Sequence, residues 1–355
     1  MDVETKIELA CRAPAEEVIT REEMKALFET KAQPVHYIGL EVSGKLHLGS
    51  LLMNGFKIND FAKAGIRTQV LLADWHSVIN NKQEGNWEKI RRASKYYEEA
   101  FKFFCPSAKI TRGSELYENN NEYWKEVIMF SKHLTLARAS RCLSILGRSE
   151  KETLELAQYL YPPMQAIDIR HMGADIAHAG MDQRKIHMVA REVFPKMGFK
   201  KPIAVHHHLL AGLSEPEKIT GEGSKEEEVY AMKMSKSKPY TAIFIHDTEE
   251  EIRDKLKKAY CPPSTEGNPV LELTKYIVFH EQKEMLVERQ EKYGGNIAYE
   301  NYAEVEKDYL GKKLHPSDLK NAVGNAVEKI VAPIRKRFEG KKELMKVFEE
   351  TAITR

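Results

Sequence analysis

The chain has 355 residues, 42% of them hydrophobic, which is enough for about two domains with sizeable cores. Its formal net charge of +2 excludes nucleic-acid binding by a global positive field, so any RNA contact must come from local basic patches. The apolar runs are too short to span a bilayer, the charged N-terminus lacks the apolar core of a secretory signal, and no CxxC pair occurs among Cys11, Cys105, Cys142 and Cys261. We therefore expect a cytoplasmic protein with free thiols and no membrane partner.

Residues 1–33 have the pattern of an N-terminal helical segment, with Thr20 and Glu23 as a capping box. From residue 34 onward, strand-like and helix-like patterns alternate. This alternation predicts an α/β catalytic domain over 34–245, built on a doubly wound, Rossmann-like parallel sheet.

The stretch His36–Ser50 combines an apolar strand-like run, a Ser-Gly turn and the start of a helical apolar pattern. A helix N-terminus after a strand end offers unpaired backbone N–H groups and the positive end of a dipole, which suit a phosphate. His47 and Gly49 lie in this first turn. An ordinary turn with a solvent-facing histidine is the alternative interpretation.

A second buried strand is predicted over Thr68–Asp74. In a doubly wound parallel sheet, ligands bind at the carboxyl ends of the strands. Asp74 and His76 are therefore expected near a site, and a buried Asp with a purely structural role is the alternative.

Glu122–Leu146 has the pattern of one long helix whose basic residues lie toward its C-terminal half, where they suit the helix dipole. A solvated helix face is the alternative to a binding role.

Three adjacent histidines, His206, His207 and His208, fall on a predicted strand. Side chains of adjacent strand residues point to opposite faces, so these three cannot converge on one ion. We predict no metal site.

Residues 214–232 are rich in Gly, Glu and Lys and have the composition of a surface loop. The loop leads into Lys-Met-Ser-Lys-Ser at Lys233–Ser237, and a flexible lid over a leaving group needs such a segment. From about residue 246 helical segments dominate, which predicts a second, α-helical domain over 246–355.

The His47–Gly49 stretch and the Lys233–Ser237 pentapeptide together resemble the paired signatures of the class I aminoacyl-tRNA synthetases. That family usually ends its first signature with a second histidine, where this chain has Ser50. Within the class, the chain is most similar to the tyrosyl-tRNA synthetases of the archaeal and eukaryotic type. The similar stretches are YIGLEVSGKLHLG (Tyr37–Gly49), LADWH (Leu72–His76), YPPMQAID (Tyr161–Asp168), GMDQRKIHM (Gly180–Met188), AYCPP (Ala259–Pro263) and LHPSDLKNAV (Leu314–Val323).

The resemblance implies ATP-dependent attachment of L-tyrosine to tRNA(Tyr) through a tyrosyl-adenylate intermediate. It further implies a homodimer with a helical dimerisation insertion around 115–160, a KMSKS loop over 214–240 and an anticodon-binding domain over 246–355. ATP would act as its Mg²⁺ complex, without a prosthetic group.

The resemblance also implies roles for individual residues. Tyrosine would be bound by Tyr37, Tyr161, Gln165, Asp168 and Gln183, with Tyr37 and Asp168 at the phenol. ATP would be bound by Gly39, His47, Gly49, Ser50 and Lys236, and the catalytic residues would be His47, Lys233 and Lys236. The tRNA contacts would be Arg184, Tyr293, His315 and Asp318.

Local patterns support part of this assignment. Tyr161, Gln165 and Asp168 are spaced i, i+4 and i+7, which places three polar groups on one helix face. A polar ligand explains such a face, and a satisfied polar network without a ligand is the alternative. Asp318 fits equally well as a helix cap before Leu319.

Two other functions remain open. A tryptophanyl-tRNA synthetase shares the fold and both signatures, but an indole offers only an N–H donor and needs no phenol partner such as Tyr37 and Asp168. A non-catalytic tRNA-binding relative is disfavoured by the complete KMSKS pentapeptide, whereas Ser50 leaves it possible.

Overall fold

The computed structural model describes residues 1–143, 154–216 and 232–350. The chain forms two compact units, which we call the sheet unit and the helical unit. The sheet unit comprises Met1–Gly44, Asn54–His208 and Glu343–Arg355, and the helical unit comprises Lys45–Met53 and Leu209–Lys342. Among the described residues, no helix combines the length and the apolar character needed to cross a membrane.

The sheet unit contains a six-stranded sheet with the order β1-β6-β5-β2-β3-β4. β1 is antiparallel to β6, and the other neighbours are parallel. The strands are β1 Ala15–Ile19, β2 Val35–Leu40, β3 Arg67–Leu72, β4 Lys109–Arg112, β5 Ile176–Gly180 and β6 Ile203–His207. The chain proceeds from β2 outward through β3 and β4 and then returns to β5 on the other side of β2. The predicted Rossmann-like fold is therefore confirmed, and its switch point lies between β2 and β5.

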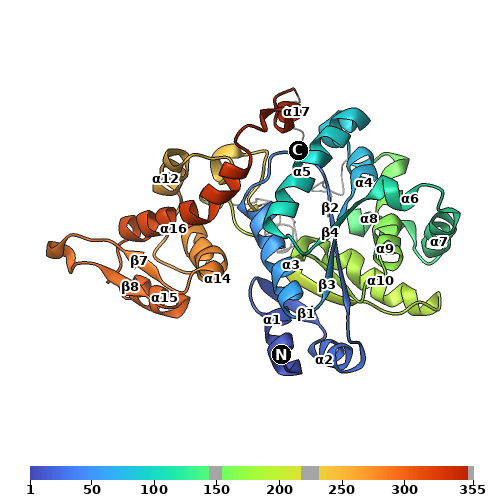
Figure 1. Cartoon of the computed structure of the whole chain (residues 1–355), viewed down its shortest axis with the longest axis horizontal. Coiled ribbons are helices and arrows are strands. Elements are labelled where there is room, and N and C mark those ends of the chain that lie inside the picture. Colours follow the sequence, from blue (N-terminus) through green and yellow to red (C-terminus); the bar gives the residue numbers. More distant parts are fainter. Residues whose placement is uncertain (144–153, 217–231, 351–355) are drawn as a thin grey trace. The chain divides into compact units, whose positions relative to one another are not determined.

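Helices cover both faces of this sheet, with α3 and α5 on one face and α9 and α10 on the other (Figure 1). Alternate strand residues contribute to the two cores: Ile176 packs with α1, α2 and α3, while Tyr37 and Ala177 pack with α9 and α10. The helices of this unit are α1 Val3–Cys11, α2 Arg21–Thr30, α3 Asn54–Lys63, α4 Asp74–Ile79, α5 Trp87–Phe104, α6 Gly113–Tyr117, α7 Asn121–Ser131, α8 Leu136–Cys142, α9 Tyr161–His171, α10 Arg184–Lys196 and α17 Lys346–Glu349.

The N-terminal segment is not wholly helical, which corrects the prediction for residues 1–33. A short edge strand, β1, lies between α1 and α2 and pairs with β6. This pairing is a long-range contact that local periodicity does not reveal. The predicted cap is present in part, because the Thr20 hydroxyl accepts a hydrogen bond from the backbone N–H of Glu23 at 3.2 Å.

The single long helix predicted over Glu122–Leu146 is also wrong. The described part of this stretch forms two helices, α7 and α8, with a break after Ser131. The Thr135 hydroxyl accepts a hydrogen bond from the backbone N–H of Arg138 at 3.3 Å, so a new helix starts with its own cap. Residues 144–153 of the predicted insertion lie outside the described residues, as do residues 217–231 of the predicted KMSKS loop.

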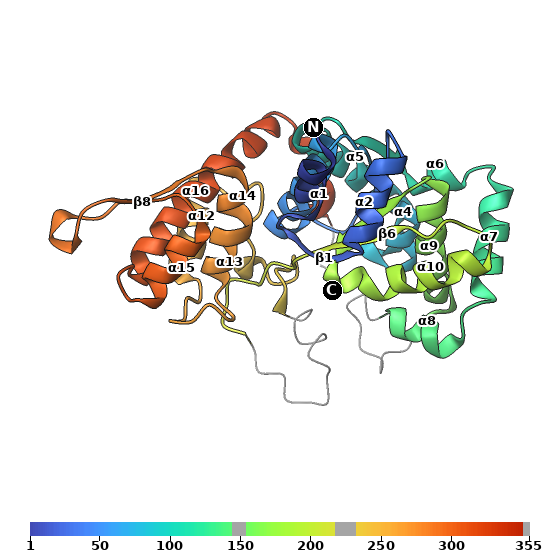
Figure 2. The same ribbon diagram turned by 90° about the horizontal axis from the view of Figure 1, so that it is seen from below.

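The helical unit contains the predicted helices and, in addition, a β-hairpin that the sequence analysis did not predict. In Figure 2 the hairpin extends away from the helices of its own unit. Its strands are only three residues long, too short for a clear alternating pattern. The elements of this unit are α12 Glu249–Lys258, α13 Pro269–Leu273, α14 Phe279–Glu281, β7 Met285–Val287, β8 Ile297–Tyr299, α15 Tyr302–Leu310 and α16 Pro316–Arg337.

The compact units differ from the predicted domains at both ends of the 246–355 segment. Residues 209–245 belong to the helical unit, whereas Glu343–Arg355 belongs to the sheet unit. There α17 packs on α5, with an ion pair between Arg92 and Glu350 at 2.8 Å and edge-to-face packing of Phe348 on Tyr96.

Candidate active site

The first part of the site lies in the sheet unit, at the carboxyl ends of β2 and β5. Tyr37 and Gly39 lie on β2, α9 leads toward β5, and Gln183 follows β5 directly. Position 39 requires glycine because the Tyr37 hydroxyl lies close to its backbone: a Cβ atom there would be 2.5 Å from the hydroxyl oxygen. The topology therefore brings the predicted tyrosine-binding residues to one edge of the sheet.

Asp168 is the centre of a group of buried phenols. Its Oδ1 atom accepts hydrogen bonds from the hydroxyls of Tyr117 and Tyr123, each at 2.8 Å. Its Oδ2 atom is buried and has no hydrogen-bond partner among the described residues. Burial raises the pKa of Asp168 to about 7, although the two tyrosine hydroxyls lower it. Burial and the Asp168 carboxylate raise the pKa of Tyr37, which keeps its phenol protonated.

His76 lies opposite the unpartnered oxygen of Asp168. Its Nε2 atom is 3.6 Å from Oδ2, and neither ring nitrogen has a hydrogen-bond partner within the described part of the chain. Burial lowers the pKa of His76 to about 3, so the ring is neutral. Asp74, the other polar residue predicted near this edge, has the structural role, because it accepts hydrogen bonds from the backbone N–H groups of Trp75 and Ser114.

The other tyrosine-binding candidates form a second polar group in the same unit. The Gln165 amide donates a hydrogen bond to Gln183 Oε1 at 3.1 Å, and Gln165 Oε1 has no partner among the described residues. Burial, followed by the nearby Glu41 carboxylate, raises the pKa of Tyr161. Glu41 in turn accepts a hydrogen bond from Asn80 at 2.8 Å.

Sequence reasoning missed three residues of these groups: Glu41, Tyr117 and Tyr123. Tyr117 and Tyr123 are 51 and 45 residues from Asp168, and no periodicity connects such positions. For Glu41 a signal was available, since it lies two residues after Gly39 at the same strand end.

Both signature stretches lie in the helical unit. The backbone N–H of Leu48 donates to the Ile243 carbonyl at 3.0 Å, and that of Ile245 donates to the Leu46 carbonyl at 3.1 Å. The chain after the KMSKS pentapeptide thus pairs with the first signature. Burial lowers the pKa of His47, and the charges of Lys236 and Lys233 lower it further. The three predicted catalytic residues therefore lie close enough to interact electrostatically.

Ser50 closes the turn that carries His47. The backbone N–H of His47 donates to Ser50 Oγ at 2.8 Å, and the hydroxyl is 3.1 Å from the His47 carbonyl oxygen. A π-helical turn, Gly49–Met53, follows. A Cβ atom on Gly49 would lie 3.1 Å from the His47 ring, so glycine leaves this ring its space.

The predicted tRNA contacts lie in both units. Arg184 pairs with both carboxylate oxygens of Glu17 at 2.9 Å in the sheet unit. In the helical unit, Tyr293 is 65% exposed and lies in the connection between β7 and β8. His315 caps α16, because its Nδ1 accepts from the backbone N–H of Ser317. The alternative that Asp318 is this cap is therefore wrong, and Asp318 lies in the first helical turn.

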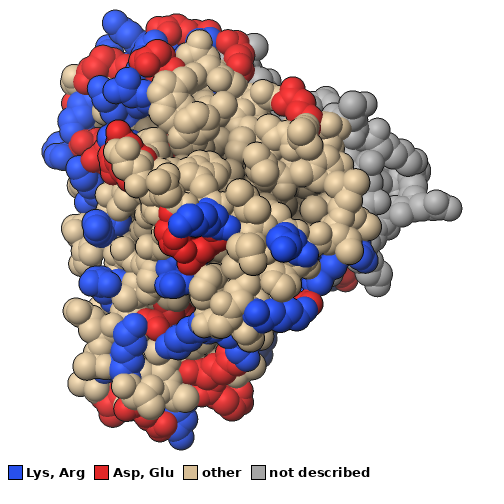
Figure 3. All heavy atoms as spheres, turned by 90° about the vertical axis from the view of Figure 1, so that its right-hand side faces the viewer, with Lys and Arg blue, Asp and Glu red and all other residues tan. Residues whose placement is uncertain are grey.

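An apolar surface lies on α7 and α8 of the sheet unit. Figure 3 shows the face that carries α7, with a broad area of uncharged atoms. The exposed large apolar side chains on these two helices are Trp124, Ile128, Met129 and Leu136. Exposed large apolar side chains that gather on two neighbouring helices indicate an interaction site.

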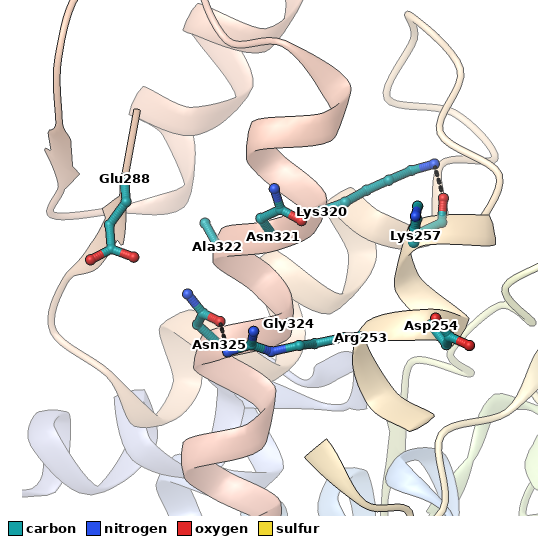
Figure 4. A pocket seen from close by; sticks show the side chains of 9 residues that line it. All are labelled: Arg253, Asp254, Lys257, Glu288, Lys320, Asn321, Ala322, Gly324 and Asn325. Carbon is teal, nitrogen blue, oxygen red and sulfur yellow. Dashed lines mark hydrogen bonds between the residues drawn. The ribbon is translucent and has the colours of Figure 1, made fainter. Parts of the chain in front are cut away.

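A pocket of about 370 Å³ lies between α12 and α16 of the helical unit (Figure 4). Its basic and amide side chains are Arg253, Lys257, Lys320, Asn321 and Asn325, and its acidic ones are Asp254 and Glu288. Lys320 donates to the carbonyl oxygen of Lys257 at 3.1 Å, and Arg253 donates to Asn325 at 3.2 Å. These bonds hold two cationic side chains across the pocket.

The consecutive histidines contact different groups, in agreement with their alternating directions. His207 lies 2.9 Å from a ring nitrogen of His178, whereas His206 lies 2.7 Å from Glu17. Within the described residues, no cluster of three or more His, Cys, Asp or Glu side chains has a geometry that could hold a metal ion.

Comparison with known proteins gives consistent matches over the whole chain. The family model described as tRNA synthetases class I (W and Y) matches residues 29–332. The tyrosine–tRNA ligase of Thermococcus sibiricus is 46% identical, with all of both chains covered. The crystal structure of tyrosyl-tRNA synthetase from Pyrococcus horikoshii, complexed with L-tyrosine, is 45% identical with a TM-score of 0.92 and covers 99% of this chain and 100% of its own. A tryptophanyl-tRNA synthetase structure from Aeropyrum pernix K1 shares only the fold, with 18% identity, a TM-score of 0.66 and coverage of 92% and 84%.

Proposed function

The chain belongs to the tyrosyl-tRNA synthetases of class I, which attach tyrosine to tRNA with ATP as a substrate, and we propose how its residues divide this reaction. One group reads the phenol, a second holds the ammonium group, and a third stabilises the phosphates. The observation that carries the proposal is the buried Asp168 carboxylate: its Oδ1 accepts hydrogen bonds from two tyrosine hydroxyls, while its Oδ2 has no partner among the described residues.

The phenol of the substrate donates a hydrogen bond to Asp168 Oδ2 and accepts one from Tyr37. Phenylalanine would leave Oδ2 buried and unpaired, which costs free energy that tyrosine does not lose. Tyrosyl-tRNA synthetases are themselves the reference example of this rule, with discrimination of about 10⁵ and no editing. The same geometry disfavours tryptophan, because an indole has no hydroxyl group.

The α-ammonium group of tyrosine is held by Tyr161, Gln165 and Gln183. Glu41 supplies the negative charge that these neutral side chains lack, and its effect on the pKa of Tyr161 indicates that it lies nearby. Asn80 keeps the carboxylate of Glu41 oriented.

In the first step the tyrosine carboxylate attacks the α-phosphorus of ATP, and pyrophosphate leaves. Both reactants are anionic, so positioning and fixed positive charge account for catalysis without a covalent enzyme intermediate. Lys233 and Lys236 stabilise the phosphates, while neutral His47 contributes a hydrogen bond. Gly39, Gly49 and the turn that Ser50 closes allow close approach of ATP. Mg²⁺ arrives with ATP as part of the substrate complex, bound mainly by the phosphates and water.

In the second step a ribose hydroxyl at the tRNA 3′ end takes the tyrosyl group from the adenylate, and AMP leaves. Asp318, His315 and the exposed ring of Tyr293 contact the anticodon, since stacking and base-edge hydrogen bonds read unpaired RNA. Arg184 contacts the acceptor stem and must exchange its bond to Glu17 for a phosphate. The cations of the pocket between α12 and α16 bind the RNA backbone. A cytoplasmic location follows from this role in translation.

We further propose that the protein is a homodimer through the apolar surface of α7 and α8. Ile128 and Leu136 are 64% and 68% exposed there, and a second copy of the chain would cover them. Sedimentation of the variant Ile128→Glu should give a monomer, whereas Lys125→Ala on the same helix should leave the dimer unchanged. A wild-type chain that sediments as a monomer would contradict the proposal.

The function is tested by ATP–pyrophosphate exchange with tyrosine, phenylalanine and tryptophan supplied separately. Exchange with tyrosine alone supports the activity and the phenol-reading group together. Exchange with tryptophan would move the specificity to the tryptophanyl branch. Tight tRNA binding without any exchange would identify a non-catalytic relative.

A further inference from the structure

We infer that His76 is a further specificity-determining residue, whose Nε2–H donates a hydrogen bond to the substrate phenol oxygen while the phenol proton is donated to Asp168 Oδ2. This inference rests on the proposed tyrosine site and adds a residue to it. His76 would act on the substrate directly, beside the carboxylate that accepts the phenol proton.

The first argument is the hydrogen-bonding state of His76. The residue lies on α4, just after β3, and only 1% of its surface is exposed. Both ring nitrogens are buried without a hydrogen-bond partner among the described residues. Buried polar side chains nearly always have partners, so two unsatisfied nitrogens on one ring indicate a ligand or a bound water.

The second argument is that two unsatisfied atoms face each other. Nε2 of His76 and Oδ2 of Asp168 are 3.6 Å apart, too far for a direct hydrogen bond. Both side chains are held in place by other contacts, so rotating either one away would cost free energy. Asp168 is fixed through Oδ1 by the hydroxyls of Tyr117 and Tyr123, and the His76 ring packs edge-on against the ring of Tyr161 at 4.5 Å.

The third argument is chemical. One hydroxyl group can satisfy both atoms, because it donates one hydrogen bond and accepts others. The phenol O–H donates its hydrogen bond to the Asp168 carboxylate oxygen, so His76 can act on the phenol oxygen only as a donor, in addition to Tyr37. A neutral imidazole has one N–H, and burial keeps His76 neutral by lowering its pKa, although the nearby backbone of Tyr161 opposes this shift.

This arrangement distinguishes substrates by how well their para substituent accepts a hydrogen bond from His76. The amino group of 4-aminophenylalanine can donate to Asp168, but its nitrogen is a poor acceptor for His76. Phenylalanine can do neither. The wild-type enzyme should therefore use tyrosine best, 4-aminophenylalanine less well and phenylalanine least.

The test measures pyrophosphate exchange with these three amino acids in the wild type and in two variants. His76→Phe keeps a ring beside Tyr161 and removes the donor, whereas His76→Gln retains an N–H donor. We expect His76→Phe to lower kcat/KM for tyrosine at least about 10-fold and that for 4-aminophenylalanine less than about 3-fold, with an unchanged KM for ATP. His76→Gln should recover most of the activity with tyrosine. An equal loss with all three amino acids, or no loss with tyrosine, would overturn the inference.

A measurement on the wild-type protein does not depend on whether the variants fold. Nitrogen-15 NMR of labelled histidines reports the tautomer of His76, and we expect the Nε2–H form with a shift on adding tyrosine but not phenylalanine. An Nδ1–H tautomer in the tyrosine complex would refute the inference. Exchange by the wild-type enzyme with tyrosine distinguishes failure of the proposed function from failure of this inference. No exchange would refute the proposed function, whereas normal exchange together with unaffected His76 variants would refute only the role of His76.

Discussion

Replacement of Asp168 by asparagine isolates the phenol-reading interaction. The asparagine side chain would retain a carbonyl oxygen for the hydroxyls of Tyr117 and Tyr123, but an NH₂ group would replace Oδ2, the atom without a partner among the described residues of the wild type. The substrate phenol would lose its charged acceptor. A hydrogen bond to a charged group contributes about 1.5–3 kcal/mol, which corresponds to a loss of about 10- to 150-fold in kcat/KM.

The assay is pyrophosphate exchange with tyrosine and with phenylalanine at equal enzyme concentrations. The tyrosine to phenylalanine ratio of kcat/KM should fall by the same factor, while the KM for ATP should not change. Asp175→Asn is a matched control, because Asp175 is a buried aspartate of the same unit that accepts hydrogen bonds from Lys31, Lys200 and the backbone N–H of Val35. If Asp168→Asn used the two amino acids in the wild-type ratio, Asp168 would not read the phenol.

Three further predictions concern charge. Lys236→Ala should slow adenylate formation in single turnovers at least about 10-fold with little change in tyrosine affinity, because a cation at the phosphates acts on the transition state; an unchanged rate would remove it from the catalytic set. Glu41→Gln should raise the KM for tyrosine about 10-fold but not weaken competition by 3-(4-hydroxyphenyl)propionate, which has no ammonium group; equal weakening would indicate a structural role. Because burial raises the pKa of Asp168 from its ordinary value to about 7, the folded state binds this proton more tightly than the unfolded chain, and stability should fall as the pH rises from about 4 to 7. In urea unfolding, Asp168→Asn should become more stable relative to the wild type over this pH range, and a constant difference would contradict the pKa shift.

Local sequence patterns were sufficient for the strands of the parallel sheet, whereas the pairing of the two signatures came from the resemblance to the family. β2 ends in the apolar run Tyr37–Leu40 and β3 in the apolar run Val70–Leu72, and such runs are typical of strands buried on both faces. The spacing of Tyr161 and Asp168 likewise predicted one helix face, which α9 provides. These features depend on periodicity within a few residues.

Features that depend on distant contacts were not predictable in this way. β1 forms because β6 offers an open edge, and its five residues carry no decisive pattern of their own. The break between α7 and α8 depends on a single cap at Thr135. The role of Ser50 follows only from the structure. Its hydroxyl accepts a hydrogen bond from the backbone N–H of His47 and so closes the turn, at a position where the family usually has histidine.

The phenol-reading group shows why a specificity site is harder to predict than the fold around it. Tyr37 comes from β2, Asp168 from α9, and Tyr117 and Tyr123 from α6 and α7, so no single stretch contains the interaction. The group also leaves Asp168 Oδ2 unsatisfied in the described chain, which a purely structural network would avoid. Tyr117 and Tyr123, which sequence reasoning missed, hold the carboxylate in place, and the unpartnered oxygen that they leave is the feature that binding of tyrosine explains.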